Sequence, residues 1–353
     1  MAQTKNPDKK TIDRLVSIRR KHHDQRSTEK LFRMIRKGDK TALSTAITIS
    51  ESDRKQDQQL SDELLRKCLK YTGNSVRIGI TGVPGVGKST FIDAFGSYLI
   101  RQGKKVAVLA VDPSSEKSGG SILGDKTRMT NLSVNEHAFI RPSASRGSLG
   151  GVAHHTRESI LLCEAAGYDV ILVETVGVGQ SETVVKSMTD FFLLLMLSGA
   201  GDELQGIKKG IMEMADAIII TKADGDNVKK ANLARAEYMN ALHLARPNTN
   251  QWIPKVETSS ALTGKGMDTC WNIISKFTET TTANGYFNKT REEQNTYWMH
   301  DAVKEIIVQS FYTDKKISSA IMKFEKELIS GKITSKQAAL KLAELFLNGK
   351  KNI

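Results

Sequence analysis

The chain has 353 residues, of which 39% are hydrophobic and 26% charged, and its formal net charge is +13. This is the composition of an ordinary globular protein, long enough for one large domain or for a core with appended segments. The apolar runs are too short to span a bilayer, and Met1–Lys5 lead into no apolar signal segment. We therefore expect a cytoplasmic protein with no membrane partner.

The positive charge is concentrated at the two ends of the chain. Residues 1–60 hold 15 Lys or Arg against 8 Asp or Glu, and residues 281–353 hold 12 against 8. Aromatic residues make up 6% of the chain and are not interleaved with these basic runs. Nucleic-acid sites combine phosphate-binding cations with groups that stack on or read the bases. Solvated basic helices are therefore a better interpretation than a nucleic-acid surface.

The three cysteines lie far apart in the sequence, at Cys68, Cys163 and Cys270. They form no C-x-x-C pair and no zinc-ligand spacing. Isolated cysteines of this kind are typically small buried packing residues in a reducing compartment, which is what we predict here.

The first 73 residues are predicted to be helical, because Leu31, Ile35, Leu43 and Ile47 recur at roughly helical spacing. From Val76 onward, short apolar or β-branched runs alternate with helical stretches, a pattern typical of parallel strands joined by crossover helices. The predicted strands are Val76–Ile80, Val106–Val111, Phe139–Ile140, Val170–Val173, Phe191–Leu197, Ala217–Ile220 and Ile253–Val256. Helices are predicted at Ser89–Arg101, Thr156–Ala166 and Val228–Leu242.

After about residue 281 the strand pattern stops and helices resume. They are predicted at Arg291–Ser310, Ile317–Ile329 and Ser335–Leu347, with Thr334 or Ser335 as the N-cap of the last one. The chain thus divides into an N-terminal helical region (1–73), an α/β domain with a mostly parallel sheet (74–281) and a C-terminal helical region (282–353).

A phosphate-binding motif follows the first predicted strand. Gly82-Val83-Pro84-Gly85-Val86-Gly87-Lys88-Ser89 matches G-x-x-x-x-G-K-[ST], and Thr90 follows inside the next helix. The glycines let backbone N–H groups turn toward phosphate oxygens, and the helix N-terminus adds donors and a favourable dipole. Lys88 is expected to reach the β- and γ-phosphates and Ser89 to bind Mg²⁺. The α/β domain is therefore predicted to be a P-loop NTPase.

The choice of base is indicated by two later strand ends. Thr221-Lys222-Ala223-Asp224 fits [NT]-K-x-D, in which the Asp carboxylate accepts hydrogen bonds from guanine N1 and N2. The Lys222 stem is expected to lie along the base or the P-loop. Ser260-Ala261-Leu262 form a second element, whose backbone N–H near Ala261 is placed to reach guanine O6. Together these elements predict GTP and GDP as ligands.

Carboxylates at other strand ends are candidates for the metal site and for hydrolysis. Glu174 ends the strand at Val170 and precedes glycines, so we expect it to hold Mg²⁺, through water. Asp112 and Asp125 lie in the loop after Val106–Val111, where carboxylates bind Mg²⁺ or orient the attacking water, or simply cap the loop. Gln180 is a weaker candidate for positioning water.

A glycine-rich stretch, Leu197–Gly210 (LSGAGDELQGIKKG), follows the most apolar predicted strand. It begins like the signature of ATP-binding cassette proteins but departs from it after the first glycine. Its charged residues Asp202, Glu203 and Lys208 lie beside a Gly-Ala-Gly hinge. An ordinary strand-to-helix loop capped by Asp202 is the alternative to a functional role.

Seven strings, in order over roughly residues 75–270, resemble the MeaB/ArgK family of P-loop GTPases, which includes the methylmalonic aciduria type A protein. They are GVPGVGKST, VDPSS with GGSILGDKTRM, RPSASRGSLGG, VETVGVGQSE, SGAGDELQGIKKGI, TKADGDN and SALTGKG. The resemblance implies a homodimeric GTPase whose C-terminal helices form a dimerisation arm. It implies a B12-dependent acyl-CoA mutase, of the methylmalonyl-CoA mutase type, as the client.

In such proteins GTP hydrolysis gates delivery of adenosylcobalamin from its adenosyltransferase and protects or reactivates the mutase. The resemblance assigns Lys88 and Ser89 to phosphate and Mg²⁺, and Asp224 to guanine. It makes Asp112, Asp125 and Glu174 the carboxylates of the metal site. The loops at Asp112–Arg128 and Val176–Glu182 become switches I and II, and Asp202, Glu203 and Lys208 belong to a third switch.

Three other functions remain open from the sequence. A P-loop kinase is disfavoured because no base for an acceptor hydroxyl stands out, and a nickel-type metallocentre GTPase because there is no His-rich tail. The third function, an RNA-associated GTPase, is supported only by the basic ends of the chain. Intrinsic hydrolysis is predicted to be slow, since no arginine finger is identifiable in cis. Arg128 and Arg146 are both candidates, and the sequence does not choose between them.

Overall fold

The computed structural model describes residues 27–52, 54–111, 129–142, 149–175, 181–199, 209–243 and 251–350. The chain forms two compact units, Met1–Glu292 and Glu293–Ile353. The domain boundaries expected at residues 73 and 281 stay predictions. Among the described residues, no helix is both long and apolar enough to cross a membrane.

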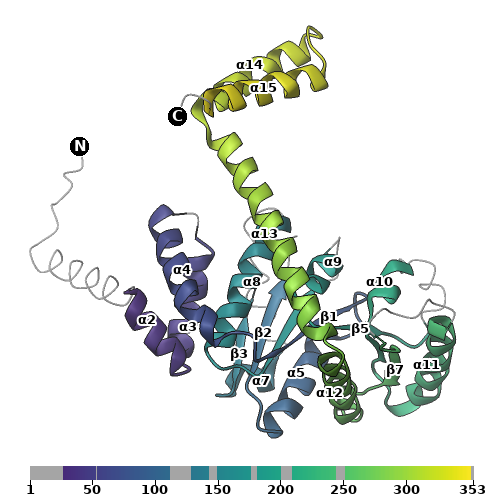
Figure 1. Ribbon diagram of the computed structural model, residues 1–353. Coiled ribbons are helices and arrows are strands. Elements are labelled where there is room, and N and C mark those ends of the chain that lie inside the picture. Colours follow the sequence, from purple (N-terminus) through teal and green to yellow (C-terminus); the bar gives the residue numbers. More distant parts are fainter. Residues whose placement is uncertain are drawn as a thin grey trace, which may run out of the picture. The chain divides into compact units, whose positions relative to one another are not determined.

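The first unit is built on a seven-stranded sheet in which every strand pair is parallel (Figure 1). The strand order is β3-β2-β4-β1-β5-β6-β7, so β1 lies at the centre. All seven predicted strands are present, and the prediction of a parallel α/β fold is confirmed. Their bounds are β1 Val76–Gly82, β2 Val106–Val111, β3 Ala138–Arg141, β4 Val170–Thr175, β5 Phe191–Met196, β6 Ala217–Ile220 and β7 Lys255–Thr258.

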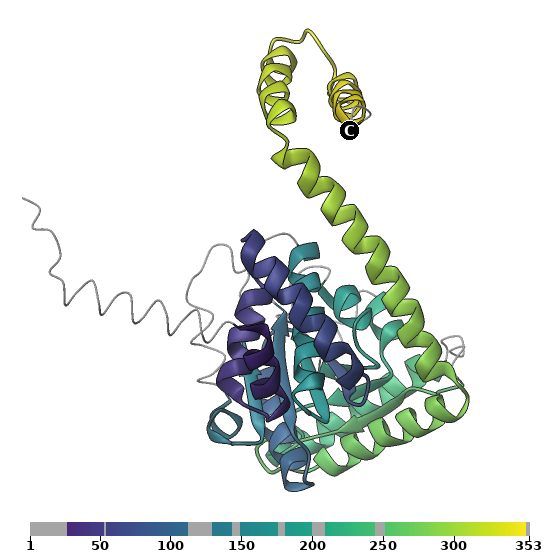
Figure 2. The same cartoon turned by 60° about the vertical axis from the view of Figure 1, so that its left-hand side comes forward.

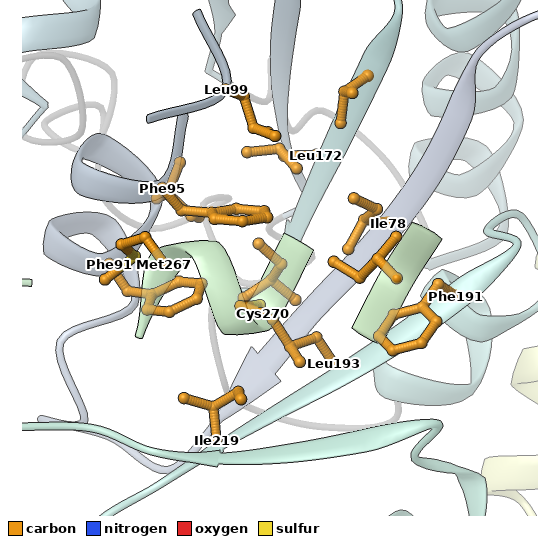
Figure 3. Packing of buried hydrophobic residues seen from close by; sticks show 14 of the residues in the cluster. Ile78, Phe91, Phe95, Leu99, Leu172, Phe191, Leu193, Ile219, Met267 and Cys270 are labelled. Atoms are coloured by element: carbon orange, nitrogen blue, oxygen red, sulfur yellow. The ribbon is translucent and has the colours of Figure 1, made fainter. Parts of the chain in front are cut away.

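Helices cover both faces of the sheet. On one face lie α5 (Lys88–Arg101), α7 (Thr130–Val134) and α12 (Met267–Ala283), packed in a single core cluster with alternate residues of the central strands. Figure 3 shows this packing, with Phe91 and Phe95 of α5 and Met267 and Cys270 of α12 around strand residues such as Ile78. Such an apolar layer on a parallel sheet supplies most of the free energy that stabilises this unit.

The other face carries α8 (Leu149–Ala165), α9 (Ser181–Lys186) and α11 (Val228–His243). Helix α11 packs on β6 and β7, where Ala231, Ala234 and Tyr238 meet a second apolar cluster. The short helix α10 (Lys209–Met214) precedes β6. Burial of the three cysteines confirms their predicted packing role, and it raises the pKa of the Cys68 thiol to about 11.

The N-terminal helices α2 (Thr28–Arg36), α3 (Lys40–Ser50) and α4 (Lys55–Cys68) lie side by side against α8 (Figure 2). The four apolar residues whose spacing predicted this region are all buried. Arg141, at the end of the edge strand β3, forms an ion pair with Glu51, the C-cap residue of α3. The N-terminal region is therefore fixed to the edge of the sheet as well as to α8.

Two buried ion pairs lie where the central strands β1 and β5 begin. Arg77 of β1 donates to both oxygens of Glu164 on α8, at 2.9 and 3.1 Å. Arg291, near the start of α13 (Tyr286–Thr313), donates to both oxygens of Asp190, at 2.8 and 2.7 Å. Buried charges are tolerated when they are paired and hydrogen-bonded in this way.

The second unit consists of the rest of α13 and the hairpin of α14 (Lys315–Ile329) and α15 (Ser335–Lys350). Helix α14 begins at Asp314, whose carboxylate accepts from the backbone N–H of Lys316 and Ile317. Helix α15 begins with a capping box: Gln337 N–H donates to the Thr334 hydroxyl, and Thr334 N–H donates to the Gln337 side chain. The predicted N-cap is therefore Thr334, not Ser335.

Candidate functional site

The predicted phosphate-binding loop joins the carboxyl end of β1 to the N-terminus of α5. Gly82 is the last residue of β1, and a Cβ there would lie 2.5 Å from the carbonyl oxygen of Leu195 on β5, so only glycine fits. Gly87 caps α5 with φ of 89°, a left-handed conformation that favours glycine. Because α5 begins at this loop, the free N–H groups and the positive dipole end of α5 face the space beside the loop.

Lys88, the first residue of α5, folds back over this loop. Its ammonium group donates to the Gly82 carbonyl oxygen at 2.8 Å. Burial lowers the pKa of Lys88, while the carboxylates of Glu174 and Glu182 act in the opposite direction. The lysine thus stands as a partly desolvated cation beside the loop, and such a cation attracts phosphate oxygens more strongly than a fully hydrated one.

The predicted metal ligands Ser89 and Glu174 are in contact. The Ser89 hydroxyl donates to Glu174 Oε1 at 3.2 Å, which joins α5 to the end of the neighbouring strand β4. The Glu174 side chain is buried. A hydroxyl and a carboxylate are hard oxygen donors, the set that Mg²⁺ prefers. These two residues fit a Mg²⁺ ion, which they would hold and which would neutralise phosphate charge at this loop.

The predicted base-reading loop is tied to the phosphate loop at two points. The Thr221 hydroxyl donates to the carbonyl oxygen of Val86 at 2.8 Å, and Lys222 Nζ donates to that of Gly85 at 2.8 Å. Lys222 therefore lies along the P-loop, one of the two positions expected from the sequence. It adopts a left-handed backbone, with φ of 56°, which costs free energy in a residue with a side chain.

Asp224 is held by the second base element. The hydroxyl of Ser260 donates to Asp224 Oδ2, and the Ser260 oxygen accepts from the backbone N–H of Thr263 at 3.2 Å. One carboxylate oxygen is thereby oriented in advance, a geometry suited to a donor pair such as guanine N1 and N2. Ala261 packs partly against the core, whereas the Leu262 side chain is 85% exposed and makes no buried wall for a base.

Several predicted residues lie outside the described residues. They are Asp112, Asp125, Arg128, Arg146, Gln180, Asp202, Glu203 and Lys208. Among the described residues, the fold brings together the P-loop, Glu174, Lys222, Asp224 and Ser260. They stand at the carboxyl ends of β1, β4, β6 and β7, the edge at which parallel α/β sheets bind ligands.

Three further residues near the site lie in the strings quoted above, but the sequence assigns none of them a role of its own. Glu182 lies in the first turn of α9, and its buried carboxylate raises the pKa of Lys88 against the lowering by burial. Asn227 and Ser198 are hydrogen-bonded to one another at 2.7 Å, and Asn227 also binds the base-reading loop. Asparagine close after a strand end often bonds to nearby backbone, but its partner Ser198 lies 29 residues earlier and no local signal identifies it.

Comparisons with known proteins identify the family of the chain. The family model described as methylmalonyl Co-A mutase-associated GTPase MeaB matches residues 43–316. The chain is 50% identical to GTPase ArgK of Escherichia coli, over 80% of this chain and 86% of that protein. It is 43% identical to the mouse protein named methylmalonic aciduria type A homolog, mitochondrial, over 92% of this chain and 80% of that one.

A solved structure gives the same picture of the fold. The crystal structure named LAO/AO transport system kinase superimposes with a TM-score of 0.70 at 39% identity, over 91% of this chain and 97% of that one. The similarity thus includes the α/β unit and most of the helical segments on both sides of it.

Proposed function

The chain belongs to the MeaB family of methylmalonyl Co-A mutase-associated GTPases, and from this premise we propose that its GTPase cycle serves a B12-dependent acyl-CoA mutase. GTP hydrolysis gates the loading of adenosylcobalamin into the mutase and protects or reactivates it. The main support is the family match together with a site that pairs a complete P-loop with a base-reading carboxylate. The client is a mutase of the methylmalonyl-CoA mutase type.

Within this cycle the P-loop, Gly82–Ser89 with Thr90, binds the phosphates, and Lys88 neutralises them. Ser89, Glu174, Asp112 and Asp125 serve a Mg²⁺ ion, for which the contact between Ser89 and Glu174 is the structural support. The guanine base is read by Asp224 with Lys222, and the turn Ser260-Ala261-Leu262 completes its site. Replacing Lys88 by alanine should abolish GTP binding or turnover, measured with a fluorescent GTP analogue and phosphate release.

The working form is a homodimer joined through the C-terminal helices. In α13, Met299, Val303, Ile306 and Ile307 recur at helical spacing, and each has an exposed side chain. Apolar side chains that share one helix face are rarely left in water in a stable protein. A second copy of the same helix is an occupant that this arm would suit.

The 197–210 stretch is the third switch, which reports the state of the nucleotide to the mutase through Asp202, Glu203 and Lys208. Replacing Lys208 by alanine should leave GTP affinity near that of the wild type but remove the stimulation of hydrolysis by the mutase. Lys230 on α11 is a matched control, because its replacement by alanine removes the same charge from an exposed helix position. Mutase-stimulated turnover that survives in the Lys208 variant would exclude this lysine from the switch.

The experiment that tests the proposal follows cobalamin. The purified chain, an adenosyltransferase loaded with adenosylcobalamin, and the apo-mutase are mixed with GTP, GDP or a non-hydrolysable GTP analogue. Transfer is read from the absorbance change of the cobalamin and from mutase activity. We expect transfer that depends on the nucleotide and is lost in the Lys88→Ala variant. Equal transfer with every nucleotide would contradict gating.

A kinase is the second candidate, because the solved relative carries the name of a transport system kinase. The two functions differ in the fate of the γ-phosphate. Hydrolysis of γ-labelled GTP should give free phosphate, and label on a protein or small-molecule acceptor would favour the kinase.

We also propose that the protein is located in the cytoplasm. Fractionation of the cells that produce it tests this location.

A further inference from the structure

Asn227 lies three residues beyond the base-reading Asp224, outside the [NT]-K-x-D pattern, and makes three hydrogen bonds in the same neighbourhood. Its side-chain Nδ2 donates to the carbonyl oxygen of Lys222 at 2.7 Å. Its Oδ1 accepts from the Ser198 hydroxyl at 2.7 Å. Its backbone N–H donates to the Asp224 carbonyl oxygen at 3.0 Å and closes the 3-10 turn Gly225–Asn227.

The orientation of this amide is fixed by its two partners. The Lys222 carbonyl can only accept, so it must face the NH₂ end, and the Ser198 hydroxyl then donates to the oxygen end. The two partners therefore determine which end of the Asn227 amide faces each of them. Both Asn227 and Ser198 are half-buried, and the bond between them is partly shielded from water, whereas the bond to Lys222 is exposed.

Lys222 is the residue that needs this support. It has a left-handed backbone although it is not a glycine, a conformation that persists only where the surroundings enforce it. The Asn227 amide holds the carbonyl of Lys222, and the next residue, Ala223, is fixed by its N–H to the Ser259 carbonyl at 2.9 Å. The direction of the chain from Lys222 to Asp224 therefore depends on Asn227.

We infer that Asn227 is a positioning residue for guanine selectivity, and that Ser198 orients it from the carboxyl end of β5. This inference rests on the proposed role of Asp224 in reading guanine. Asn227 does not touch the base. It keeps the Lys222 backbone in the conformation that directs the Asp224 carboxylate toward the base. Ser198, two residues after the end of β5, connects that loop to the chain that follows this strand.

Two substitutions separate the two side-chain bonds. Asn227→Asp keeps an acceptor for the Ser198 hydroxyl but cannot donate to the Lys222 carbonyl. Ser198→Ala keeps the bond to Lys222 but removes the group that orients the amide, whereas Ser198→Thr retains the hydroxyl. Asp226→Ala is the matched control, because Asp226 is an exposed residue of the same turn.

The readout is the affinity for GDP relative to inosine diphosphate, which lacks the N2 amine that Asp224 is expected to bind. A variant that was merely less stable would lose affinity for both ligands equally. We expect Asn227→Ala and Asn227→Asp to weaken GDP binding about tenfold and to reduce the preference for GDP over inosine diphosphate. Ser198→Ala should shift this preference in the same direction by about two- to threefold, Ser198→Thr should restore it, and Asp226→Ala should leave it unchanged.

An unchanged preference in folded Asn227→Asp and Ser198→Ala variants would overturn the inference. If the Asn227 variants do not fold, as judged by circular dichroism, Ser198→Ala and Ser198→Thr decide it by the same ratio. A wild-type protein with no preference for GDP over ADP would instead contradict the role of Asp224, and therefore the proposed function itself.

Discussion

The proposed chemistry of this site depends on individual side chains, and the sequence predicts those that belong to short motifs. The structure places Lys88, Ser89 and Asp224 where their motifs predict. The residue types of a P-loop and of a T-K-x-D string determine the local backbone geometry that these side chains require. The support for these residues is not predictable in the same way. Asn227 and Ser198 meet only because β5 and β6 are neighbours in the sheet.

The carboxylate of Asp224 gives the first prediction at this scale. Asp224→Asn retains one acceptor but presents an NH₂ group to the N–H donors of guanine, so GTP affinity should fall about 100-fold, and the preference for GTP over ATP should shrink. Competition binding with a fluorescent GDP analogue measures both. An unchanged preference for GTP would refute the base-reading role.

The buried pair of Arg77 and Glu164 gives a prediction about pH. Burial opposes ionisation of the Glu164 carboxyl, but Arg77 and the hydrogen bonds from Gly73 and Ser75 outweigh it and hold the pKa of this carboxyl below its ordinary value. A carboxyl whose pKa is lowered on folding stabilises the protein above its unfolded pKa. That contribution is lost as the pH falls through the folded pKa.

Glu164→Gln should therefore lower the free energy of unfolding at pH 7 by about 3 kcal/mol, because Arg77 is left buried without its counter-charge. The difference from the wild type should narrow once the pH falls below about 4.5. Urea denaturation at a series of pH values measures it. Glu29→Gln is the control, since Glu29 pairs with Arg33 and Lys67 on the exposed surface, where ion pairs contribute little. A difference that is constant with pH would contradict the assignment.

At the scale of elements, strands were easier to predict than helices. The apolar runs of a buried parallel sheet are continuous, so all seven were visible in the sequence. Helix α8 begins at Leu149, whereas the sequence predicted a start at Thr156. The difference arises because Gly150 and Gly151 in the first turns weaken the helical pattern of the sequence. The short helices α7, α9 and α10 were not predicted, since five or six residues show no periodicity.

Arg291, in the first turns of α13, gives a prediction about the stability of this helix. Besides Asp190, Arg291 binds the carbonyl oxygens of Gly73 and Ser75, at 2.6 Å each, and so fastens the first turns of α13 to the segment before β1. Arg291→Ala should lower the free energy of unfolding by about 3 kcal/mol, because it leaves the Asp190 carboxylate buried without its cation. Thermal unfolding followed by circular dichroism measures this loss.

Arg291→Lys should restore only part of the stability, because an ammonium group cannot make the bidentate contact and reach both carbonyls at once. Arg33→Ala, which removes an exposed arginine from the pair with Glu29, is the matched control and should change the unfolding temperature little. Full rescue by lysine would show that only the charge at this position matters.

At the scale of the whole molecule, the strand order could not be derived from the sequence. Seven apolar runs of similar length are compatible with many arrangements, and their order depends on how the crossover helices pack. The order found places β1 between β4 and β5. The P-loop is thereby brought next to Glu174 at the end of β4 and to the stretch that begins after β5. The proposed metal site and the proposed third switch both depend on this arrangement.

The proposed homodimer gives a prediction for the assembled molecule. Replacing Ile306, which has an exposed side chain on α13, by aspartate would place a charge inside the proposed interface and should shift the protein from dimer to monomer. Sedimentation velocity measures the shift. Gln309→Asp adds the same charge at an exposed polar position of the same helix and should leave the dimer intact. A wild-type protein that sediments as a monomer would contradict the proposal.

The most direct test of the whole account is the rate of GTP hydrolysis by the purified chain, measured as phosphate release with and without its mutase. We expect slow hydrolysis by the chain alone, at least a tenfold acceleration by the mutase, and no comparable turnover of ATP. A rate that the mutase does not change, or equal turnover of GTP and ATP, would contradict it.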